Sequence, residues 1–413
     1  MPTTSVIRAV LTRSAIIKLA LGWGSFVVLL LAGNLLDGDL STPVLFTVLG
    51  LIVAVILACA SGVVTEAEHL AEKLGDPYGT LVLTLSIVLI EVILISAVML
   101  GPGEHATIAR DSVMAVSMII LNLVVGISLL VGGLRHSNLR PNRTGVSAYL
   151  SLLVVLVTVA FALPRLIGGD GAYTAAQAVP IAALTVALYA FFLVRQMGAQ
   201  RADFQEVVVP AGSAPAPAKP AAAAGPAAAA GPAAGPAAGP AGAPVAGPAA
   251  GPANKLADAL ANHRPELIAR SLLLVAMVVP IVLLSHDMAA LLDDGLDRLG
   301  APIALSGILI AMIVFLPETI TAIRAALAGE IQRVSNLCHG ALVSTVGLTI
   351  PAVLTIGLLT GQTVTLGEGP TNLLLLGVSL LLTLTTFSGR RVTALHGAAH
   401  LFVFVLYGIT VFQ

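Results

Sequence analysis

Two glutamates are the residues of this chain whose placement best allows chemistry. Glu91 is the only acidic or basic residue in the stretch 77–103, and Glu318 is the only one in the stretch 299–323. Both stretches are predominantly apolar, and a carboxylate in hydrocarbon costs several kcal/mol unless it is protonated, paired or solvated. Because no basic side chain lies at a comparable depth in either stretch, the two glutamates are candidates for holding protons or cations.

The chemistry of such a pair follows from the competition for its oxygens. Two carboxylates at a shared site repel each other, which raises their affinity for protons. The pair then holds either protons or a divalent cation, and this exclusion is what cation/proton exchange requires. Oxygen ligands suit a hard ion such as calcium. The simpler alternative is a pair of protonated glutamates packed between helices.

The composition indicates that the elements around these glutamates are membrane spans. Of the 413 residues, 57% are hydrophobic and only 10% are charged, and the mean hydropathy is +1.01. A soluble protein of this size needs a more polar surface. The net charge of -1 gives no basic field for nucleic acid, so the expected partners are the lipid bilayer and inorganic cations. Homo-oligomerisation is left open.

Eleven apolar runs are long enough to cross a bilayer, which takes about 20 residues each. They occupy residues 15–36, 43–65, 78–100, 112–134, 145–167, 173–195, 267–286, 302–325, 335–360, 370–388 and 392–412. Gly, Pro and charged clusters separate them, as is typical of loops. The sequence therefore predicts an all-α polytopic membrane protein with eleven transmembrane helices, of which 335–360 is one helix kinked at Pro351.

Lysine and arginine fix the predicted orientation. With the N-terminus in the cytoplasm, 17 of the 20 basic residues fall in cytoplasmic segments and only Arg110, Arg165 and Arg298 fall outside. An excess of Lys and Arg on the cytoplasmic side is the rule for such proteins. An error of one helix would destroy the asymmetry, so the distribution supports the count and places the C-terminus outside.

The cysteines and the first apolar run exclude a secreted, disulfide-bonded protein. Cys59 and Cys338 are the only cysteines and both lie in apolar segments, so no disulfide framework is expected. The first run is long enough to span, and no cleavage site typical of a signal peptide precedes Asp37. Embedded Ser/Lys, Asp/Asp or zinc-hydrolase patterns are also missing from the sequence, which argues against an intramembrane enzyme, and no cofactor is expected.

A low-complexity linker divides the chain. Residues 210–253 are almost entirely Ala, Gly and Pro, a composition that cannot form a core. We predict a cytoplasmic tail and extra helix at 1–42, a five-helix unit at 43–197, a disordered linker at 198–264 and a second five-helix unit at 265–413.

The two five-helix units resemble each other. Residues 72–77 read Glu-Lys-Leu-Gly-Asp-Pro, and residues 297–302 read Asp-Arg-Leu-Gly-Ala-Pro. In each unit another acid lies four residues upstream and a lone glutamate lies downstream in an apolar helix. Since five is an odd number of helices, the second unit must enter the membrane from the opposite face. Inverted repeats are typical of secondary transporters, whose ion site lies near the midplane, and a two-gated carrier fits this pattern better than a passive channel.

Further candidates accompany the two glutamates. Pro317 removes a helix hydrogen bond beside Glu318, and the freed carbonyls either coordinate an ion or only accommodate a packing kink. Candidate secondary ligands or proton-path groups, which could equally be helix-packing contacts, are Ser117, Asn122, Asn336, Ser344 and Thr345. Glu68 and Glu72 share a helix face at the cytoplasmic end of the second span and could sense cations, or simply be a solvated helix end.

These motifs resemble the cation/proton exchanger branch of the calcium/cation antiporter superfamily, and especially bacterial calcium/proton antiporters that also handle sodium or potassium. The most specific parts are Leu-Gly-Asp-Pro-Tyr-Gly at 74–79, Leu-Ile-Glu-Val at 89–92 and Pro-Glu-Thr at 317–319, with Gln-Arg-Val-Ser-Asn-Leu at 332–337 and Gly-Leu-Thr-Ile-Pro at 347–351. The resemblance implies a bacterial cytoplasmic-membrane protein, eleven helices, alternating access, and Glu91 and Glu318 as ligands of transported calcium and as proton carriers. Sodium or potassium exchange on the same site is the alternative.

One departure from that family concerns the ligand set. The wider superfamily places a Gly-Asn pair three to four residues before each glutamate, whereas this chain has Ile87-Val88 and Val314-Phe315. No asparagine amide is available there, so ligands beyond the glutamates have to come from elsewhere.

The linker generates the first testable prediction. Because residues 212–250 cannot pack, their deletion is expected to leave transport activity and membrane insertion at the level of the intact chain. Transport by vesicles matched for inserted protein checks this. Loss of transport at a normal level of insertion would show that the linker does more than connect the two units.

Overall fold

The structure is a computed structural model that describes residues 10–36, 40–74, 106–206, 252–302 and 304–412, together with positions 85, 88, 92, 95, 96 and 99. Within these residues the chain is helical, and extended pairing is limited to isolated bridges such as Leu139 with Val392. The all-α prediction is therefore confirmed.

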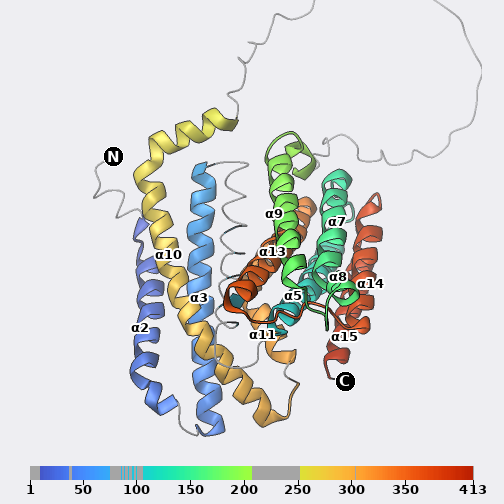
Figure 1. Cartoon of the computed structure of the whole chain (residues 1–413). Helices are drawn as coiled ribbons and strands as arrows, with labels where there is room; N and C mark the ends of the chain where they lie inside the picture. The colour runs from blue at the N-terminus through green and yellow to red at the C-terminus, as the bar shows by residue number, and fades with distance from the viewer. Residues whose placement is uncertain are drawn as a thin grey trace, which may run out of the picture.

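The helices cross the molecule side by side (Figure 1). In chain order they are α2 (Arg13–Leu36), α3 (Thr42–Leu74), α5 (Ile108–Met118), η1 (Ile119–Val124), α6 (Val125–Arg135), α7 (Arg143–Val157), η2 (Thr158–Ala162), α8 (Leu163–Ile167), α9 (Ala175–Met197), η3 (Arg201–Phe204), α10 (Pro252–Leu299), α11 (Ala304–Val314), α12 (Leu316–Ala328), α13 (Ile331–Thr360), α14 (Pro370–Ser388) and α15 (Ala394–Val411). Here η1 and η2 are π-helical segments inside longer helices, and η3 is a 3₁₀ turn.

The predicted spans agree with these helices. Among the described residues, nine helices are long and apolar enough to cross a bilayer, and the bent pair α11–α12 makes a tenth. These ten coincide with ten of the predicted runs, and α13 continues through Pro351 as a single helix. The remaining run, 78–100, lies largely outside the described residues, although its six described positions are helical.

The predicted disordered linker, 198–264, is too long at both ends. Residues 201–204 form η3, and α10 already begins at Pro252. Residues 253–264 read Ala-Asn-Lys-Leu-Ala-Asp-Ala-Leu-Ala-Asn-His-Arg, and most of these are good helix formers. Their alanines resemble the linker in composition, but they lack its repeated Gly and Pro. Residues 207–251 lie outside the described part of the chain.

The helix predicted at 267–286 is also much longer than expected. α10 has 48 residues and includes the acidic stretch after residue 286. Hydropathy falls at that point, but the residues that follow remain good helix formers. The helix ends at Gly300, whose φ of +62° is easily adopted only by glycine. The Ala301 N–H donates to the Leu296 carbonyl at 2.9 Å and closes the cap.

The run 302–325 is a broken span rather than one continuous helix. α11 and α12 meet at an angle of 59°. Pro317 lies in the first turn of α12, where its missing N–H costs nothing, whereas inside a continuous helix the proline would leave a carbonyl unpaired. The predicted loss of a helix hydrogen bond at Pro317 is thus seen as a complete break.

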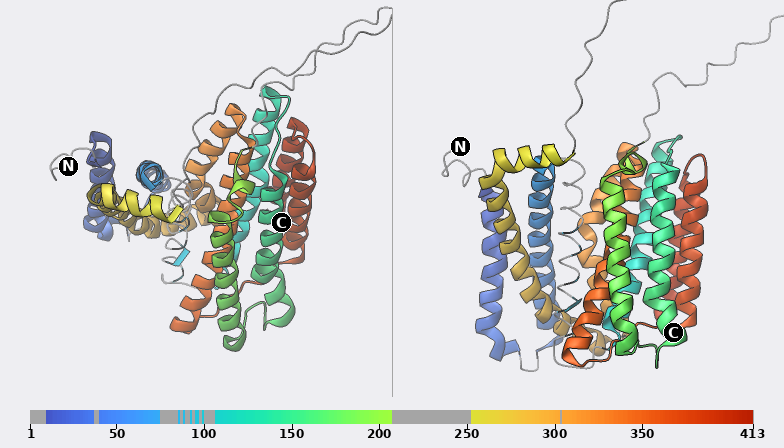
Figure 2. Two further views of the ribbon diagram at one scale, coloured as in Figure 1. Left: turned by 90° about the horizontal axis from the view of Figure 1, so that it is seen from above. Right: turned by 45° about the horizontal axis from the view of Figure 1, so that its top comes forward.

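The helices form two groups in space. Buried side chains of α2, α3 and α10 make one apolar cluster, and those of α5 to α7, α9 and α12 to α15 make another. Figure 2 shows the two groups of helices. α11 contributes Ile310 to the first cluster and Ala311 to the second, so it lies between them. The chain leaves α9 and enters α10 at the same face of the molecule, which we call the linker face (Figure 1).

Contacts near the end of η3 connect the two halves of the chain. The Glu206 carboxylate accepts hydrogen bonds from the backbone N–H groups of Gln332 at 3.1 Å and Arg333 at 3.3 Å. These are unpaired donors of the first turn of α13, so Glu206 caps this helix and complements its dipole. Partial burial raises the pKa of the Glu206 carboxyl, and the N–H groups of α13 oppose that rise.

A charged network joins α3 to α10 near the linker face. Arg270 is buried, and its Nη1 donates to Glu66 Oε2 at 2.7 Å while its Nε donates to Glu266 Oε1 at 3.1 Å. Lys73 Nζ lies 3.4 Å from Glu266 Oε2. Both ends of the Glu66–Arg270 pair are inaccessible to water, so each charge depends on the other.

Replacing Arg270 with Met is expected to destabilise the fold by about 3 kcal/mol, because a buried carboxylate at Glu66 loses its partner. Thermal or denaturant unfolding in detergent measures this. The control is Arg333→Met, whose pair with Glu330 is exposed and contributes about 1 kcal/mol or less. The double variant Glu66→Gln/Arg270→Met should recover most of the loss. Equal destabilisation by the two single variants would contradict the role given to the network.

Candidate functional site

Glu318 lies at the break between α11 and α12. It is the third residue of α12, so the positive end of the helix dipole faces its carboxylate. Only 9% of the residue is exposed, and Oε2 is buried without a hydrogen-bond partner among the described residues. A buried carboxylate oxygen with a free lone pair is suited to accept a proton or to bind a cation.

A small cavity lies against this carboxylate. Its volume is about 10 Å³, roughly what one water molecule requires. The lining residues come from three elements: Ile120 and Val124 of η1, Phe315 and Glu318 at the α11–α12 break, and Leu337, Cys338 and Ala341 of α13. Apart from Glu318 the described lining is apolar, so the described part of the site holds Glu318 in an occluded setting.

The wall of the cavity opposite α12 is the π-helical segment η1. Such segments widen a helix by one residue per turn and are frequent at functional sites. Asn122 lies in η1 with no exposed surface, and its Nδ2 donates to the Ser379 hydroxyl of α14 at 2.8 Å. Asn122 Oδ1 has no partner among the described residues. The segment η1, whose Ile120 and Val124 line the cavity beside Glu318, thus also carries the Asn122 amide oxygen that has no partner among the described residues.

Neither Asn122 nor the other polar candidates are among the residues that line the cavity. Ser117 is buried and donates to the Val113 carbonyl in its own helix. Asn336 is occupied on both sides of its amide, since it donates to the Phe204 carbonyl at 2.6 Å and accepts from Gln332 Nε2.

The remaining two candidates, Ser344 and Thr345 of α13, are not among the lining residues either. Ser344 accepts from the Tyr189 hydroxyl at 2.9 Å and donates to the Gly340 carbonyl. Thr345 is fully buried. Neither is among the residues that surround the cavity beside Glu318. Their geometry fits helix packing, which the sequence left as an equal alternative.

Glu91 lies outside the described residues, so the predicted pairing of Glu91 with Glu318 stays a prediction. Pro317 is in the first turn of α12, as described above. Glu68 and Glu72 are both exposed near the end of α3, and Glu72 Oε2 lies 3.8 Å from His69 Nδ1. Both carboxylates are accessible, and their sensor role stays a prediction.

A further buried carboxylate, Glu368, was missed by sequence analysis. It is 2% exposed in the loop before α14, and its Oε2 accepts from the Gly369 N–H and from Asn372 Nδ2, both at 3.0 Å. Arg110 Nε lies 3.8 Å from Oε1, which has no hydrogen-bond partner among the described residues. Burial raises the pKa of the Glu368 carboxyl, and Asn372 and Arg110 oppose the rise. A glutamate in a Gly-Glu-Gly loop gives no sequence signal of burial.

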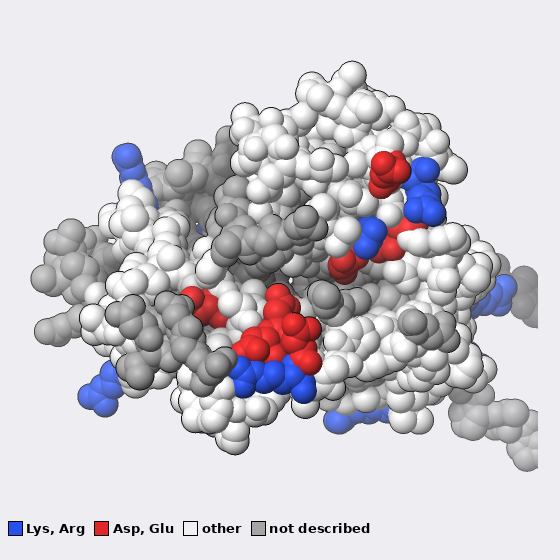
Figure 3. All heavy atoms as spheres, turned by 60° about the horizontal axis from the view of Figure 1, so that its bottom comes forward, with Lys and Arg blue, Asp and Glu red and all other residues white. Residues whose placement is uncertain are grey.

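The face opposite the linker face carries groups of acidic side chains beside basic ones (Figure 3). The last turns of α10 contribute Asp293, Asp294 and Asp297, where Arg298 Nη2 pairs with Asp294 at 2.8 Å. Arg110 and Asp111 form a second pair at 2.8 Å. Acidic groups on the water-exposed face of a membrane protein raise the local concentration of cations.

Metal-ligand clusters are not found in the described part of the chain: no group of three or more His, Cys, Asp or Glu side chains comes together there. Both cysteines, Cys59 and Cys338, are free and buried, as predicted.

This arrangement, a broken helix with a buried acid at the break inside a helical bundle, is that of a secondary transporter. The chain belongs to the sodium/calcium exchanger protein family, whose profile it matches over residues 44–198 and 270–413. It is therefore a multi-pass membrane protein that transports cations, and it is not an enzyme. The resemblance drawn from the sequence motifs is confirmed.

Two curated relatives match most of the chain. It is 29% identical over 390 residues to the sodium-potassium/proton antiporter ChaA of Escherichia coli K12, covering 94% of this chain and 95% of ChaA. It is 31% identical over 350 residues to the putative ionic transporter y4hA of Sinorhizobium fredii, covering 83% of each.

Solved structures share the fold. Native YfkE superposes with a TM-score of 0.63 at 15% identity, covering 96% of this chain and 99% of YfkE. The H⁺/Ca²⁺ exchanger CAX superposes with a TM-score of 0.62 at 12% identity, covering 96% of this chain and 89% of CAX. At these identities the likeness concerns the fold alone.

The small cavity beside Glu318 generates a prediction about Cys338, which lines it and is 4% exposed. In a Cys59→Ala background Cys338 is the only thiol. Its reaction with a small hydrophilic methanethiosulfonate should be much slower than that of a cysteine at exposed Ser388, placed in a cysteine-free background. Addition of a transported cation should change the Cys338 rate and leave the Ser388→Cys rate unaltered. Equal rates at the two positions would show that the cavity is open.

Proposed function

We propose that this protein exchanges calcium for protons across the bacterial cytoplasmic membrane by alternating access, with Glu91 and Glu318 binding the cation and the protons in competition. The observation that carries the proposal is Glu318: a buried carboxylate at a helix break, with one oxygen unpartnered among the described residues. Protonation makes the carboxyl neutral and cheap to bury, whereas cation binding neutralises the ionised form, so either occupant allows the site to move through an apolar interior.

The proposed architecture is eleven spans, made of one extra helix followed by two inverted five-helix units, 43–197 and 265–413. α3 and α10 support it, since they open the two proposed units, pack against each other and run in opposite directions across the molecule (Figure 1). The broken span α11–α12 then corresponds to the run 78–100, and Glu318 to Glu91. An ion site between two such units can be closed from either side in turn.

The proposed orientation has the linker face and the N-terminus in the cytoplasm and the C-terminus outside. The distribution of basic residues along the chain favours it, because most of them belong to segments of the linker face. In this orientation the acidic side chains of Figure 3 face outward. Glu68 and Glu72 would then meet cytoplasmic cations, and we propose them as an exposed sensor.

Calcium is favoured over sodium and potassium by the chemistry of the ligands. Two carboxylates neutralise the two charges of a calcium ion, and only oxygen ligands are expected. Two of the structurally similar proteins are the H⁺/Ca²⁺ exchanger CAX and the Ca²⁺/H⁺ antiporter YfkE. The second candidate is sodium or potassium/proton exchange at the same site, favoured by the 29% identical relative ChaA, a sodium-potassium/proton antiporter.

Everted membrane vesicles test the site. With a pH gradient imposed, calcium should collapse the gradient in vesicles that contain the intact protein. Glu91→Gln and Glu318→Gln should each abolish the collapse, because the neutral amide can neither release a proton nor balance the cation charge. The matched control is Glu330→Gln, a glutamate between α12 and α13 whose side chain is 43% exposed and pairs with Arg333. Unchanged activity in both site variants would overturn the assignment.

The same vesicles test the ion. Calcium, sodium and potassium are added separately at equal concentration, and the expected order of response places calcium first. A gradient that collapses with sodium or potassium and not with calcium would replace the first candidate by the second, while the glutamate variants would still report on the site.

A further inference from the structure

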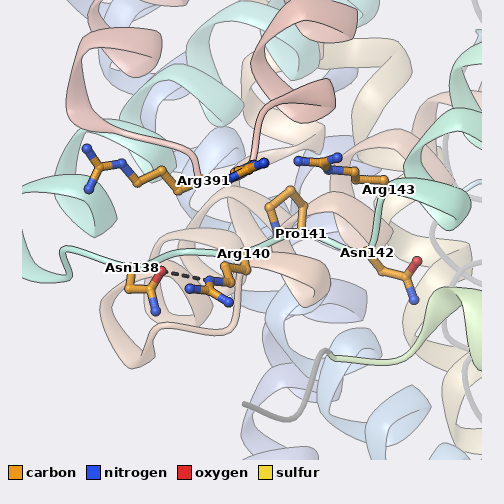
Figure 4. A pocket seen from close by; sticks show the side chains of 7 residues that line it. Asn138, Arg140, Pro141, Asn142, Arg143 and Arg391 are labelled. Carbon is orange, nitrogen blue, oxygen red and sulfur yellow. Dashed lines mark hydrogen bonds between the residues drawn. The ribbon is translucent and has the colours of Figure 1, made fainter. Parts of the chain in front are cut away.

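Four arginines surround an open pocket on the linker face (Figure 4). Arg140 and Arg143 come from the connection between α6 and α7, and Arg390 and Arg391 from the connection between α14 and α15. The pocket has a volume of about 710 Å³. A bridge holds the two connections together, in which the Val392 N–H donates to the Leu139 carbonyl at 3.0 Å.

The charge of this pocket is not compensated. No carboxylate is among its lining residues. Arg140 Nε donates to Asn138 Oδ1 at 2.8 Å and Arg143 Nε donates to the Gly389 carbonyl at 3.2 Å, so neutral groups orient these two side chains. Arg390 and Arg391 are exposed and make no hydrogen bond or ion pair with any described residue. Four arginines that line one pocket, with no acid among the lining residues, form a site for an anion, above all a phosphate.

An apolar groove continues from the same pocket. It runs between α7 and α14, has a volume of about 200 Å³ and shares Arg143 with the arginine pocket. Leu150 and Leu384 line it together with Phe387. One turn further along the same helix faces, Val154 is 50% and Leu381 is 61% exposed. The groove therefore leads from the arginines onto an apolar flank of the bundle.

We propose that the arginine pocket and the groove together bind one anionic phospholipid, with the phosphate among the arginines and an acyl chain between α7 and α14. The position at the ends of four spans is the level at which headgroups lie. Basic pockets between transmembrane helices are suited to anionic headgroups, and the apolar groove gives an acyl chain a place that a free phosphate could not use. A zwitterionic lipid would place the cationic group of its headgroup in a pocket that already has four arginines.

The purified full chain in detergent, analysed by native mass spectrometry, tests the proposal with dioleoyl phosphatidylglycerol as the probe and dioleoyl phosphatidylcholine as its neutral counterpart. Intact protein should retain one phosphatidylglycerol in preference to phosphatidylcholine. Arg390→Gln/Arg391→Gln removes two charges without breaking a contact, and should weaken retention about 25-fold, roughly fivefold for each arginine. The matched control, Arg135→Gln/Arg195→Gln, removes two exposed arginines of the same face and should retain the lipid like the intact protein.

A second variant separates the lipid from its headgroup. Ser147→Trp fills the groove from an exposed position, leaves every arginine in place, and should weaken retention of phosphatidylglycerol. Protection against thermal unfolding by inorganic phosphate, equal to that by the lipid and unchanged in Ser147→Trp, would show a free-anion site and overturn the proposal. Equal retention of phosphatidylglycerol by the Arg390→Gln/Arg391→Gln variant and by its control would overturn it as well.

Discussion

Backbone hydrogen bonding in a medium without water is the constraint on which the structure depends. An unpaired N–H or carbonyl in lipid costs several kcal/mol, so a spanning helix can break only where other protein surrounds the break. The break before Pro317 obeys this rule, since Phe315 is 1% exposed and lies between η1 and α13. The chain thus places irregular backbone in the middle of the bundle. The same break puts Glu318 in the first turn of a helix, where the dipole makes an ionised carboxylate less costly.

Both helix groups contribute to the structural support of the site at Glu318. α13 and η1 are mostly buried and form two of the walls beside Glu318. α11 connects them to the group of α2, α3 and α10. In the α3–α10 pair the buried Glu66–Arg270 contact fixes one end with a specific geometry that apolar packing alone does not impose. Apolar faces in lipid slide easily, because lipid tails solvate them as well as other side chains do. A buried ion pair fixes the register between two such helices.

The sequence could predict whatever depends on composition and on local chemistry. Ten spans, the free cysteines and the isolation of Glu318 in an apolar run follow from hydropathy and from the absence of neighbouring charges. The length of α10 could not be predicted in this way, since an amphipathic extension resembles a loop once hydropathy falls. Contacts between distant segments were also out of reach. Asn122 meets Ser379 across 257 residues, and Glu368 is buried only because α5 brings Arg110 to its loop. Asn336 is a candidate ligand by its sequence position, but in the structure its side-chain amide donates a hydrogen bond to the Phe204 carbonyl.

The capping of α13 by Glu206 has a consequence for how the chain is assembled. Glu206 and Phe204 belong to the first half of the sequence, whereas the helix that they contact belongs to the second. The halves are therefore attached by noncovalent contacts on the near side of the Ala/Gly/Pro stretch, as well as by the stretch itself. Peptide-bond continuity between the halves adds a high local concentration to these contacts. Two separately translated polypeptides, one ending after residue 206 and one beginning before residue 252, carry all the described contacts needed to recognise each other in the bilayer.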